Sequence, residues 1–332
     1  MKMLLPLLLL ALSGPAFPVL RADDKPAAAP AASAALLAPP AVPAPPAPAA
    51  VPAPPLTPAP PFTRTEDVVY GRKFGMALTL DVIQPPKPNG FGILMMISGG
   101  WFSSHDAINP GSYAPFLDRG YTVFAVCHGS QPRFIVTEIV PDIHRAVRFV
   151  RANAARWSVD PEHLGITGGS AGGHLSLTMA TQGGPGNANA KDPINRVSSA
   201  VQAVACFFPP TDFLNYGQPG EDAVGVGILK DFQPAFGPGS GSPESRRKLG
   251  HEISPINFIT AKMPPVLIIH GDADTLVPIQ QARIFVEKAT AAGANAKLIT
   301  KPGLGHGWAA MGTDAADLAD WFDGYLRGIK KP

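Results

Sequence analysis

Short apolar runs alternate with helix-like segments from about residue 62 to the end of the chain. The runs are rich in Val, Ile and Leu and have the length of buried strands. They predict eight strands, at residues 66–72, 77–83, 91–98, 121–127, 163–168, 201–207, 265–270 and 296–301. Because helix-like segments separate these runs, we expect an α/β fold with a mostly parallel eight-stranded sheet and helices on both faces.

The segment PDIHRAVRFVRANAARW shows the amphipathic pattern of one predicted helix. We expect this helix to begin at Pro141, since proline is favoured in the first helical turn. One apolar stripe contains Ile143, Ala146, Val147, Val150 and Ala154. The basic residues fall mostly on the opposite face, where we expect solvent exposure, and they are His144, Arg145, Arg148 and Arg151.

The alternation lapses over residues 211–262, where Gly and Pro separate short apolar pieces. This stretch is too long for an ordinary connection between two elements. Ligands of parallel α/β sheets bind at the carboxyl ends of the strands, and functional loops gather there. We therefore expect a small cap-like insertion over a cleft, with a decorated loop as the alternative.

The beginning of the chain does not have the pattern of a folded domain. A short apolar run interrupted by prolines predicts a secretory signal peptide over residues 1–22, with a retained membrane anchor as the alternative. From residue 25 to 61, 29 of 37 residues are Pro or Ala, which supply too little large apolar surface to order the chain. We expect a disordered linker over 23–61, a folded domain over 62–332, and an exported protein without an integral membrane domain after cleavage.

The net charge of +2, with no block of like charges, disfavours nucleic acid and anionic membrane as partners. The two cysteines, Cys127 and Cys206, lie in apolar strand-like runs and are expected to be buried thiols. No Cys/His cluster has the spacing of zinc ligands. We therefore expect chemistry without a metal or a cofactor.

The stretch ITGGSAGGHLSL places Ser170 among glycines, at the turn between the fifth predicted strand and a helix that starts at Ala171. Glycine at positions 168 and 172 would let the strand and helix backbones approach closely. Such a turn projects the hydroxyl above the sheet edge and lets the Ala171 N–H face a developing oxyanion. The G-x-S-x-G pattern is weak by itself, so this interpretation requires a base and an acid nearby.

Candidates for both groups follow later strands. The seventh predicted strand ends in a loop with Asp272 and Asp274, and the eighth ends in a glycine-flanked loop with His306. A serine nucleophile needs a histidine to take its proton and an acid to orient that histidine. The order Ser, Asp, His is the order of one sheet-based hydrolase architecture. Asp212 is a rival acid, although we expect it to cap the segment that follows it.

The folded segment resembles the α/β-hydrolase superfamily, and GGSAGGH, HGDADTLVP and GHGW resemble its exported esterase-like branch, which includes acetylxylan and feruloyl esterase relatives. The resemblance implies Ser170 as the nucleophile and His306 as the general base and then acid. Relatives with the pattern H-G-x-x-D-x-x-V-P use the aspartate of that pattern to orient the histidine. This residue is Asp274 here, rather than Asp272.

The loop after the third predicted strand departs from this resemblance. Many relatives carry H-G-G-G-W there, whereas residues 97–101 of this chain read ISGGW. The resemblance implies an oxyanion hole formed by the N–H of Ala171 together with that of Gly99 or Gly100. How the loop is held, and which of its amides faces inward, stay open at this point.

Several other side chains are candidates for the surroundings of the site. The aromatic residues expected to contact substrate are Trp101, Phe207, Phe208 and Trp308, with core packing as an alternative for the last three. The residues that would either line the cleft or lie in solvated loops are His105, Asp106 and His128. We expect His174 to pack or hydrogen-bond inside the fold rather than react, and His270 to help hold the acid-bearing loop.

Together these features predict an exported serine hydrolase that cleaves carboxylic esters through an acyl-enzyme. The expected substrate is a small-molecule or polysaccharide-linked ester, with acetyl or feruloyl groups as examples. A serine peptidase or amidase of the same fold is one alternative. A binding protein without catalytic activity on a hydrolase scaffold is the other.

Overall fold

The computed structural model describes residues 61–329. The predicted signal peptide over 1–22 and the predicted linker over 23–61, except for its last residue, lie outside the described residues. None of the helices within residues 61–329 has both the length and the hydropathy that crossing a membrane would require.

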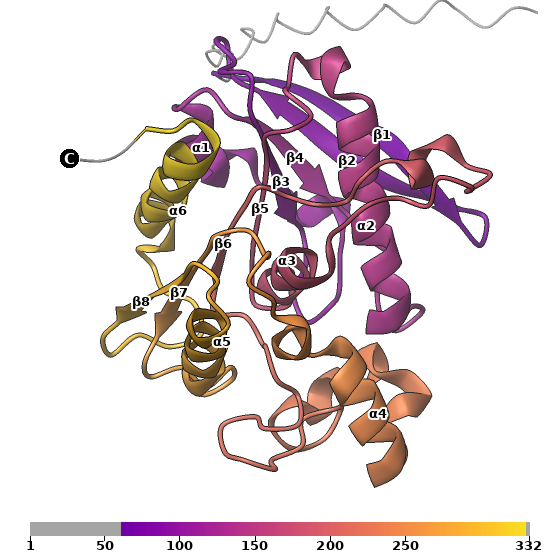
Figure 1. Ribbon diagram of the computed structural model, residues 1–332, viewed down its shortest axis with the longest axis vertical. Coiled ribbons are helices and arrows are strands. Elements are labelled where there is room, and N and C mark those ends of the chain that lie inside the picture. Colours follow the sequence, from indigo (N-terminus) through magenta and orange to yellow (C-terminus); the bar gives the residue numbers. More distant parts are fainter. Residues whose placement is uncertain (1–60, 330–332) are drawn as a thin grey trace, which may run out of the picture. The chain divides into compact units, whose positions relative to one another are not determined.

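Eight strands form one sheet, close to the predicted positions (Figure 1). They are β1 (Thr63–Lys73), β2 (Met76–Gln84), β3 (Gly92–Met96), β4 (Thr122–Val126), β5 (Leu164–Gly169), β6 (Ala203–Phe207), β7 (Val266–Gly271) and β8 (Ala296–Lys301). Their spatial order is β1-β2-β4-β3-β5-β6-β7-β8. The pairs β1/β2 and β2/β4 are antiparallel, and all other neighbours are parallel. The predicted mostly parallel sheet is confirmed.

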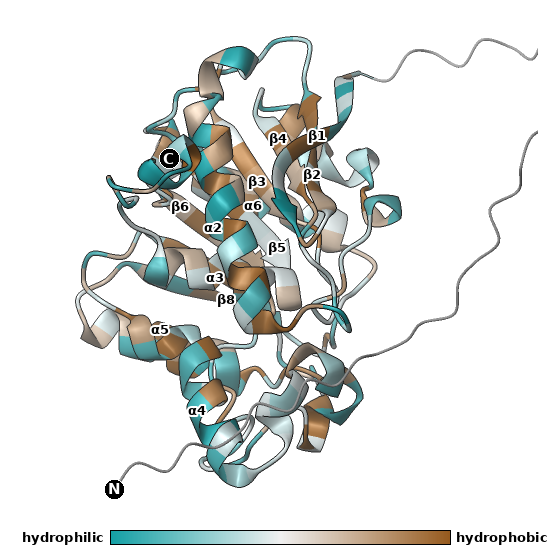
Figure 2. Cartoon of the chain, turned by 90° about the vertical axis from the view of Figure 1, so that its right-hand side faces the viewer, coloured by the Kyte–Doolittle hydropathy of each residue, from teal (hydrophilic) through white to brown (hydrophobic). Residues whose placement is uncertain are grey.

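Helices cover both faces of this sheet, as predicted. They are α1 (Ala114–Leu117), α2 (Val136–Ala152), α3 (Ala171–Gln182), α4 (Pro243–Ile253), α5 (Gln280–Ala291) and α6 (Met311–Leu326). One core contains residues of α2, α3 and α5, and the core on the other face contains residues of α1 and α6. Hydrophobic residues concentrate on the central strands, whereas α2 and α5 carry both hydrophobic and hydrophilic residues (Figure 2).

Helix α2 differs from its prediction at its start. It begins at Val136, and Pro141 lies inside it. Val136 and Ile139 are fully buried, so the apolar stripe extends one turn and more before the proline. Pro141 therefore lies in the helix but is not its first residue. The stabilisation from burying the apolar residues of the preceding turn outweighs the loss of the one hydrogen bond that proline cannot donate.

The basic face of α2 is also less solvated than predicted. Arg151 is only 8% exposed, and its guanidinium donates to the carbonyls of Ser198 and Ala200, both at 2.5 Å. His144 Nδ1 lies 2.9 Å from the hydroxyl of Ser199 in the same segment. The expected solvation is wrong for Arg151, because a distant loop covers this side of the helix and presents carbonyl oxygens to it.

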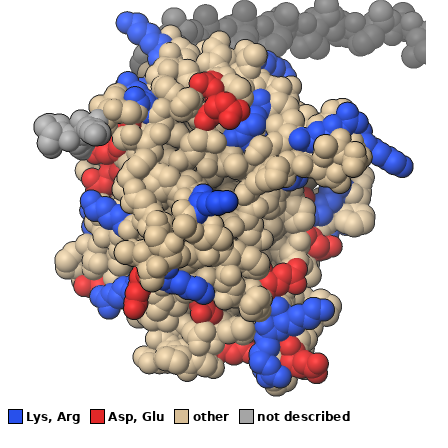
Figure 3. Space-filling view, viewed as in Figure 1, with Lys and Arg blue, Asp and Glu red and all other residues tan. Residues whose placement is uncertain are grey.

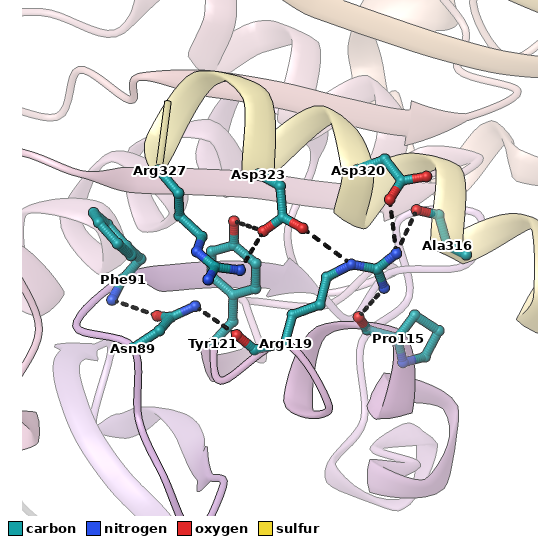
Figure 4. A network of polar contacts seen from close by, with 9 residues as sticks. All are labelled: Asn89, Phe91, Pro115, Arg119, Tyr121, Ala316, Asp320, Asp323 and Arg327. Carbon is teal, nitrogen blue, oxygen red and sulfur yellow. Dashed lines mark hydrogen bonds and ion pairs between the residues drawn. The ribbon is translucent and has the colours of Figure 1, made fainter. Parts of the chain in front are cut away.

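A network of ion pairs fixes α6 against the end of α1 (Figure 4). Arg119 donates to Asp320 at 2.8 Å and to Asp323 at 3.1 Å, both on α6, and to the Pro115 carbonyl of α1 at 2.6 Å. The Tyr121 hydroxyl donates to the Asp323 carboxylate at 2.9 Å. These contacts set the spacing between two helices that both contribute to the wall of one apolar cavity.

The insertion at residues 211–262 contains the 3-10 helices η5 (Gly227–Ala235), η6 (Gly237–Ser240) and η7 (Pro255–Phe258), together with α4. Two of its aromatic rings, Phe213 and Phe236, pack on Trp101, which lies in the loop after β3. The Ile253 carbonyl accepts a hydrogen bond from His174 Nε2 at 2.7 Å. The insertion therefore packs on that loop and on α3, and its action as a cap over substrate stays a prediction.

Candidate active site

Ser170 occupies a sharp turn between β5 and α3, with φ of +54° and ψ of −120°. A Cβ atom on Gly168 would lie 2.7 Å from backbone atoms of Gly172, and one on Gly172 would lie 2.8 Å from the Met96 carbonyl oxygen. No real Cβ tolerates such contacts, so both positions require glycine. The expected close approach of strand and helix is confirmed, and it leaves the serine hydroxyl at the carboxyl edge of the sheet.

The structure brings Ser170, His306 and Asp274 together in one hydrogen-bonded chain. His306 Nε2 lies 2.9 Å from Ser170 Oγ, and His306 Nδ1 lies 2.8 Å from Asp274 Oδ2. An ionised carboxylate only accepts hydrogen bonds, so Nδ1 carries the proton of the neutral imidazole. Nε2 is therefore free to accept the proton of the serine hydroxyl.

Asp274 is held in its loop from several sides. It is 6% exposed, and its Oδ1 accepts the N–H groups of Leu276 and Val277, both at 2.9 Å. Burial favours the neutral acid, but hydrogen bonds with His270, His306 and Val277 outweigh it and hold the pKa of Asp274 well below its ordinary value. His270 Nε2 also lies 2.8 Å from the Val277 carbonyl, which confirms the predicted role of His270 in holding this loop.

The two rival acids lie elsewhere. Asp272 accepts the N–H of Gly303 at 2.6 Å, and it thereby ties the loop after β7 to the loop after β8. Asp212 accepts the N–H of Leu214 at 3.0 Å, so it caps its own segment as predicted. Neither carboxylate is hydrogen-bonded to His306, which leaves Asp274 as the partner of that imidazole.

The loop after β3 forms a two-residue turn that narrows the choice of oxyanion donor. Gly99 and Phe102 exchange two backbone hydrogen bonds of 2.9 Å, and the central residues Gly100 and Trp101 have φ of +54° and +60°. The Gly99 N–H is thus used inside the turn. Within residues 61–329, the N–H groups of Gly100 and Ala171 have no hydrogen-bond partner, and these two stay available for an oxyanion.

Trp101 does not lie where a substrate-binding residue is expected. It is 2% exposed, and its Nε1 donates to His174 Nδ1 at 3.2 Å. Its ring packs against Phe213 and Phe236 of the insertion. The expected role of Trp101 in substrate binding is therefore wrong, because the turn directs this side chain into the core. The expected internal hydrogen bonding of His174 is confirmed.

A cavity of about 330 Å³ lies beside the turn of Ser170. It is bounded by Ser98 and Gly99 of the loop after β3 and by Gly168 and Gly169 at the end of β5. Its apolar walls include Met95, Ile97, Tyr113, Phe116, Met311, Ala315 and Leu318. Most of these residues come from the helices tied together by Arg119. None of these seven was expected from the sequence, because no local pattern reports that two distant helices leave a space.

The remaining predicted residues divide into three groups. Phe207 lines the cavity. The Phe208 ring lies 4.5 Å from the His306 ring, and Trp308 packs on Phe208 at 5.8 Å, so both support the histidine and lie outside the cavity lining. His105 lies 3.3 Å from Asp81 near β2 and likewise does not line the cavity.

A parallel sheet in this strand order, a serine at a strand-to-helix turn and a Ser–His–Asp chain define the protein as a member of the α/β-hydrolase class. The BD-FAE family model matches residues 80–289 of the sequence. The chain therefore belongs to the BD-FAE family. The resemblance to the α/β-hydrolase superfamily and its esterase-like members is confirmed, whereas export stays a prediction.

Curated relatives are named as esterases. The probable carboxylic ester hydrolase LipM of Mycobacterium tuberculosis is 29% identical over 229 residues, which are 67% of this chain and 51% of the relative. Esterase LipQ of the same organism is 28% identical, over 70% of this chain and 54% of the relative. An acetylxylan esterase of Xylanibacter ruminicola is 30% identical over 29% of this chain and 20% of its own length. The chain thus spans about half the length of the first two relatives.

Solved structures that are similar to this chain are also named as esterases. A truncated carbohydrate esterase from gut microbiota has a TM-score of 0.67 and 29% identity, over 78% of this chain and 95% of that one. Esterase 2 of Thermogutta terrifontis has a TM-score of 0.62 and 26% identity, over 82% of this chain and 97% of that one. Another structure of that esterase, at a TM-score of 0.58 and 25% identity over 80% of this chain and 94% of that one, is described as phosphorylated by paraoxon.

Proposed function

We propose that this protein is an exported serine hydrolase that cleaves carboxylic esters, with acetyl or feruloyl esters of polysaccharide as its substrate class. One observation carries the catalytic part of the proposal: Ser170, His306 and Asp274 form a hydrogen-bonded chain with distances of 2.9 and 2.8 Å. This arrangement is what nucleophilic attack by a serine hydroxyl requires. Export is supported only by the signal-like first 22 residues of the sequence.

In the proposed acylation step, Ser170 Oγ attacks the ester carbonyl carbon while His306 Nε2 takes the hydroxyl proton. The buried Asp274 carboxylate stabilises the imidazolium that forms, and its lowered pKa keeps it ionised. The N–H groups of Gly100 and Ala171 stabilise the negative oxygen of the tetrahedral intermediate. The intermediate then collapses, His306 returns the proton to the leaving alcohol oxygen, and the acyl group stays on Ser170.

In the proposed deacylation step, water takes the place of the alcohol. His306 Nε2 removes a proton from this water as its oxygen attacks the acyl carbon. The second tetrahedral intermediate uses the same two backbone donors, and its collapse breaks the bond to Ser170 Oγ. His306 returns the proton to the serine, and the carboxylic acid leaves.

The apolar cavity supports a choice within the proposed substrate class. Its volume of about 330 Å³ corresponds to roughly ten water-sized groups, far more than an acetyl group fills. Because it adjoins both the turn of Ser170 and the loop that carries Gly100, it is suited to the acyl side of an ester. We therefore place feruloyl or comparably large apolar acyl groups ahead of acetyl.

The charge distribution agrees with a substrate that is not a polyanion. Lys and Arg are interspersed with Asp and Glu on the face in Figure 3, and uncharged surface separates them. With a net charge of +2, the chain offers no strong overall field for steering anions. The names of the relatives that mention carbohydrate and acetylxylan support the polysaccharide part of the proposal.

The test compares the full-length protein with its Ser170→Ala variant. Both are assayed on aryl acetate, butyrate, octanoate and feruloyl esters, and on a chromogenic peptide. We expect ester turnover to fall by roughly 10⁴ or more in the variant. Equal turnover by the two proteins would overturn the proposal. Cleavage confined to the peptide would replace it with an amidase.

A further inference from the structure

Ser98 and His128 occupy equivalent positions at the carboxyl edge of the sheet. Met96 at the end of β3 is paired in register with Val126 at the end of the parallel strand β4. Ser98 and His128 each follow two residues later, so their side chains leave the edge next to one another. Ser98 Oγ lies 2.8 Å from His128 Nε2.

The direction of this hydrogen bond follows from the other side of the ring. His128 Nδ1 lies 2.7 Å from the carbonyl oxygen of Gly129, which can only accept, so Nδ1 carries the proton. Nε2 is then the acceptor, and the hydroxyl of Ser98 is the donor. His128 is 5% exposed, and burial lowers its pKa to about 4, so this neutral form persists at neutral pH.

Further hydrogen bonds attach the loop after β3 to the segment that follows β4. The Gln131 N–H donates to the Trp101 carbonyl at 3.2 Å, and the Ser103 N–H donates to Ser130 Oγ at 2.9 Å. The His128 N–H donates to Ser103 Oγ at 3.2 Å. The segment 128–131 therefore holds the loop on both sides of its two-residue turn.

Ser98 also connects this loop to the nucleophile. Its carbonyl accepts the Gly172 N–H at 3.2 Å, in the first turn of the helix that begins at Ala171. Ser98 therefore lies in the loop that carries the unpaired N–H of Gly100, and it is hydrogen-bonded to the helix that begins with the unpaired N–H of Ala171. Where this residue stands, many relatives have the first glycine of H-G-G-G-W, which has no side chain to donate a hydrogen bond.

We propose that Ser98 and His128 are positioning residues whose hydrogen bond aims the Gly100 N–H at the same point as the Ala171 N–H. In this chain the pair replaces the histidine of the H-G-G-G-W pattern, which the sequence lacks. The inference rests on the proposed function, since it concerns the oxyanion formed in ester hydrolysis. Loss of the bond misdirects a donor without changing the nucleophile or the histidine that is its base, and removing the bond by His128→Phe also leaves the lining residues of the acyl cavity unchanged.

The test uses three variants of the full-length protein: Ser98→Ala, His128→Phe and Ser98→Thr. For Ser98→Ala and His128→Phe we expect kcat to fall roughly ten- to hundredfold, because one oxyanion donor is no longer held in the correct orientation. We expect KM to stay within about threefold of the wild-type value. Affinity for a trifluoromethyl ketone, which forms a tetrahedral adduct, should fall in parallel with kcat/KM. Ser98→Thr keeps the hydroxyl and should retain most of the activity. The double variant should lose no more than the worse single one.

A matched control is available at the opposite edge of the sheet. Ser199 precedes β6, and its hydroxyl lies 2.9 Å from Nδ1 of the partly buried His144, another serine–histidine pair. Ser199→Ala removes a bond of the same kind and should leave kcat within about twofold of wild type at a temperature where it is folded.

Three results would overturn the inference. The first is a kcat within twofold of wild type in both Ser98→Ala and His128→Phe. The second is a loss that follows only the folded fraction measured by urea unfolding, as a purely structural role would give. The third is an equal loss in Ser199→Ala. Each is distinct from failure of the proposed function, which is judged by the dependence of turnover on Ser170. If one variant does not fold, the other decides alone.

Discussion

His306 Nε2 lies 2.9 Å from Ser170 Oγ, although 136 residues separate the two in the chain. The contact arises because β5 and β8 end at the same edge of a parallel sheet, and each carries its functional residue in the loop that follows. Asp274 lies in the loop after β7, which ends at the same edge, and its carboxylate is hydrogen-bonded to His306. The proposed catalysis therefore depends on the parts of the fold that hold these three loops in place.

The first prediction separates Asp274 from its rival Asp212. Asp274→Asn should lower kcat by roughly 10⁴, because an amide N–H facing Nδ1 would favour the tautomer with its proton on Nε2, as the corresponding change does in trypsin. Asp212→Asn is the matched control, since asparagine also caps and the Asp212 carboxylate is hydrogen-bonded to Leu214 and Asn215 of its own segment. Steady-state kinetics on an aryl butyrate measures both. A large loss in Asp212→Asn with none in Asp274→Asn would contradict the assignment.

The second prediction concerns the approach of β5 to α3. Gly172→Ala should destabilise the fold by roughly 1–3 kcal/mol, because its Cβ would lie 2.8 Å from the backbone oxygen of Met96. Gly184→Ala is the control, since a Cβ there has no neighbour within 4 Å, and its effect should stay within about 1 kcal/mol. Urea unfolding compares the two variants with wild type. Equal stabilities would show that the turn has more room than the structure gives it.

The third prediction tests the cavity as the acyl site. Ala315 lines it from α6, so Ala315→Leu should lower kcat/KM for octanoate and feruloyl esters roughly tenfold and spare the acetate ester. Thr313→Leu places the same leucine side chain on an exposed position of α6 and should change none of these values. Relative rates across the acyl series are the readout. An equal loss on acetate and octanoate would place the acyl group elsewhere.

The fourth prediction follows from two buried histidines, His128 and His174, and the partly buried His144. Burial lowers the pKa of His128, His144 and His174 to about 4, whereas an unfolded histidine has a pKa of about 6.5. Between these values the unfolded chain binds protons that the folded protein does not. Stability is therefore highest above pH ~6.5 and falls toward pH ~4, by up to roughly 1.4 kcal/mol per pH unit for each histidine.

The variant His144→Asn tests this account directly. It removes one of the three groups, so the slope of the free energy of unfolding against pH should decrease by up to roughly 1.4 kcal/mol per unit between pH ~6 and ~4.5. Urea unfolding at several pH values gives the slope, whatever the absolute stability of the variant. Identical slopes in variant and wild type would mean that His144 takes up a proton in the folded state as well.

The sequence was informative where a structural need is met locally. Buried parallel strands require uninterrupted apolar runs, so the central strands β3 to β7 were predicted close to their positions. The antiparallel strands β1 and β2 and the partly exposed β8 also lie close to their predicted positions. The turn at Ser170 requires glycine within two residues on each side, and the glycine-flanked loop of His306 follows directly after a strand. Because both features are local, the sequence pattern was enough to single out Ser170 and His306.

The sequence was least informative where distant segments meet. Arg151 was expected in solvent, but the carbonyls of Ser198 and Ala200, 47 and 49 residues away, cover it. The cavity depends on α1 and α6, which Arg119 and Asp320 join across 201 residues. Trp101 followed the family pattern in sequence, yet its environment is set by the insertion. Such contacts depend on how elements pack, and periodicity within one element does not report them.

The most direct test of the central claim is covalent labelling of the nucleophile. The full-length protein would be treated with paraoxon and digested, and its peptides mapped by mass spectrometry. One diethylphosphoryl group should be found on Ser170, nitrophenolate should be released in equal amount, and ester hydrolysis should stop; Ser170→Ala should not be labelled. A stoichiometric label on another serine, or continued hydrolysis by a fully labelled protein, would contradict the account.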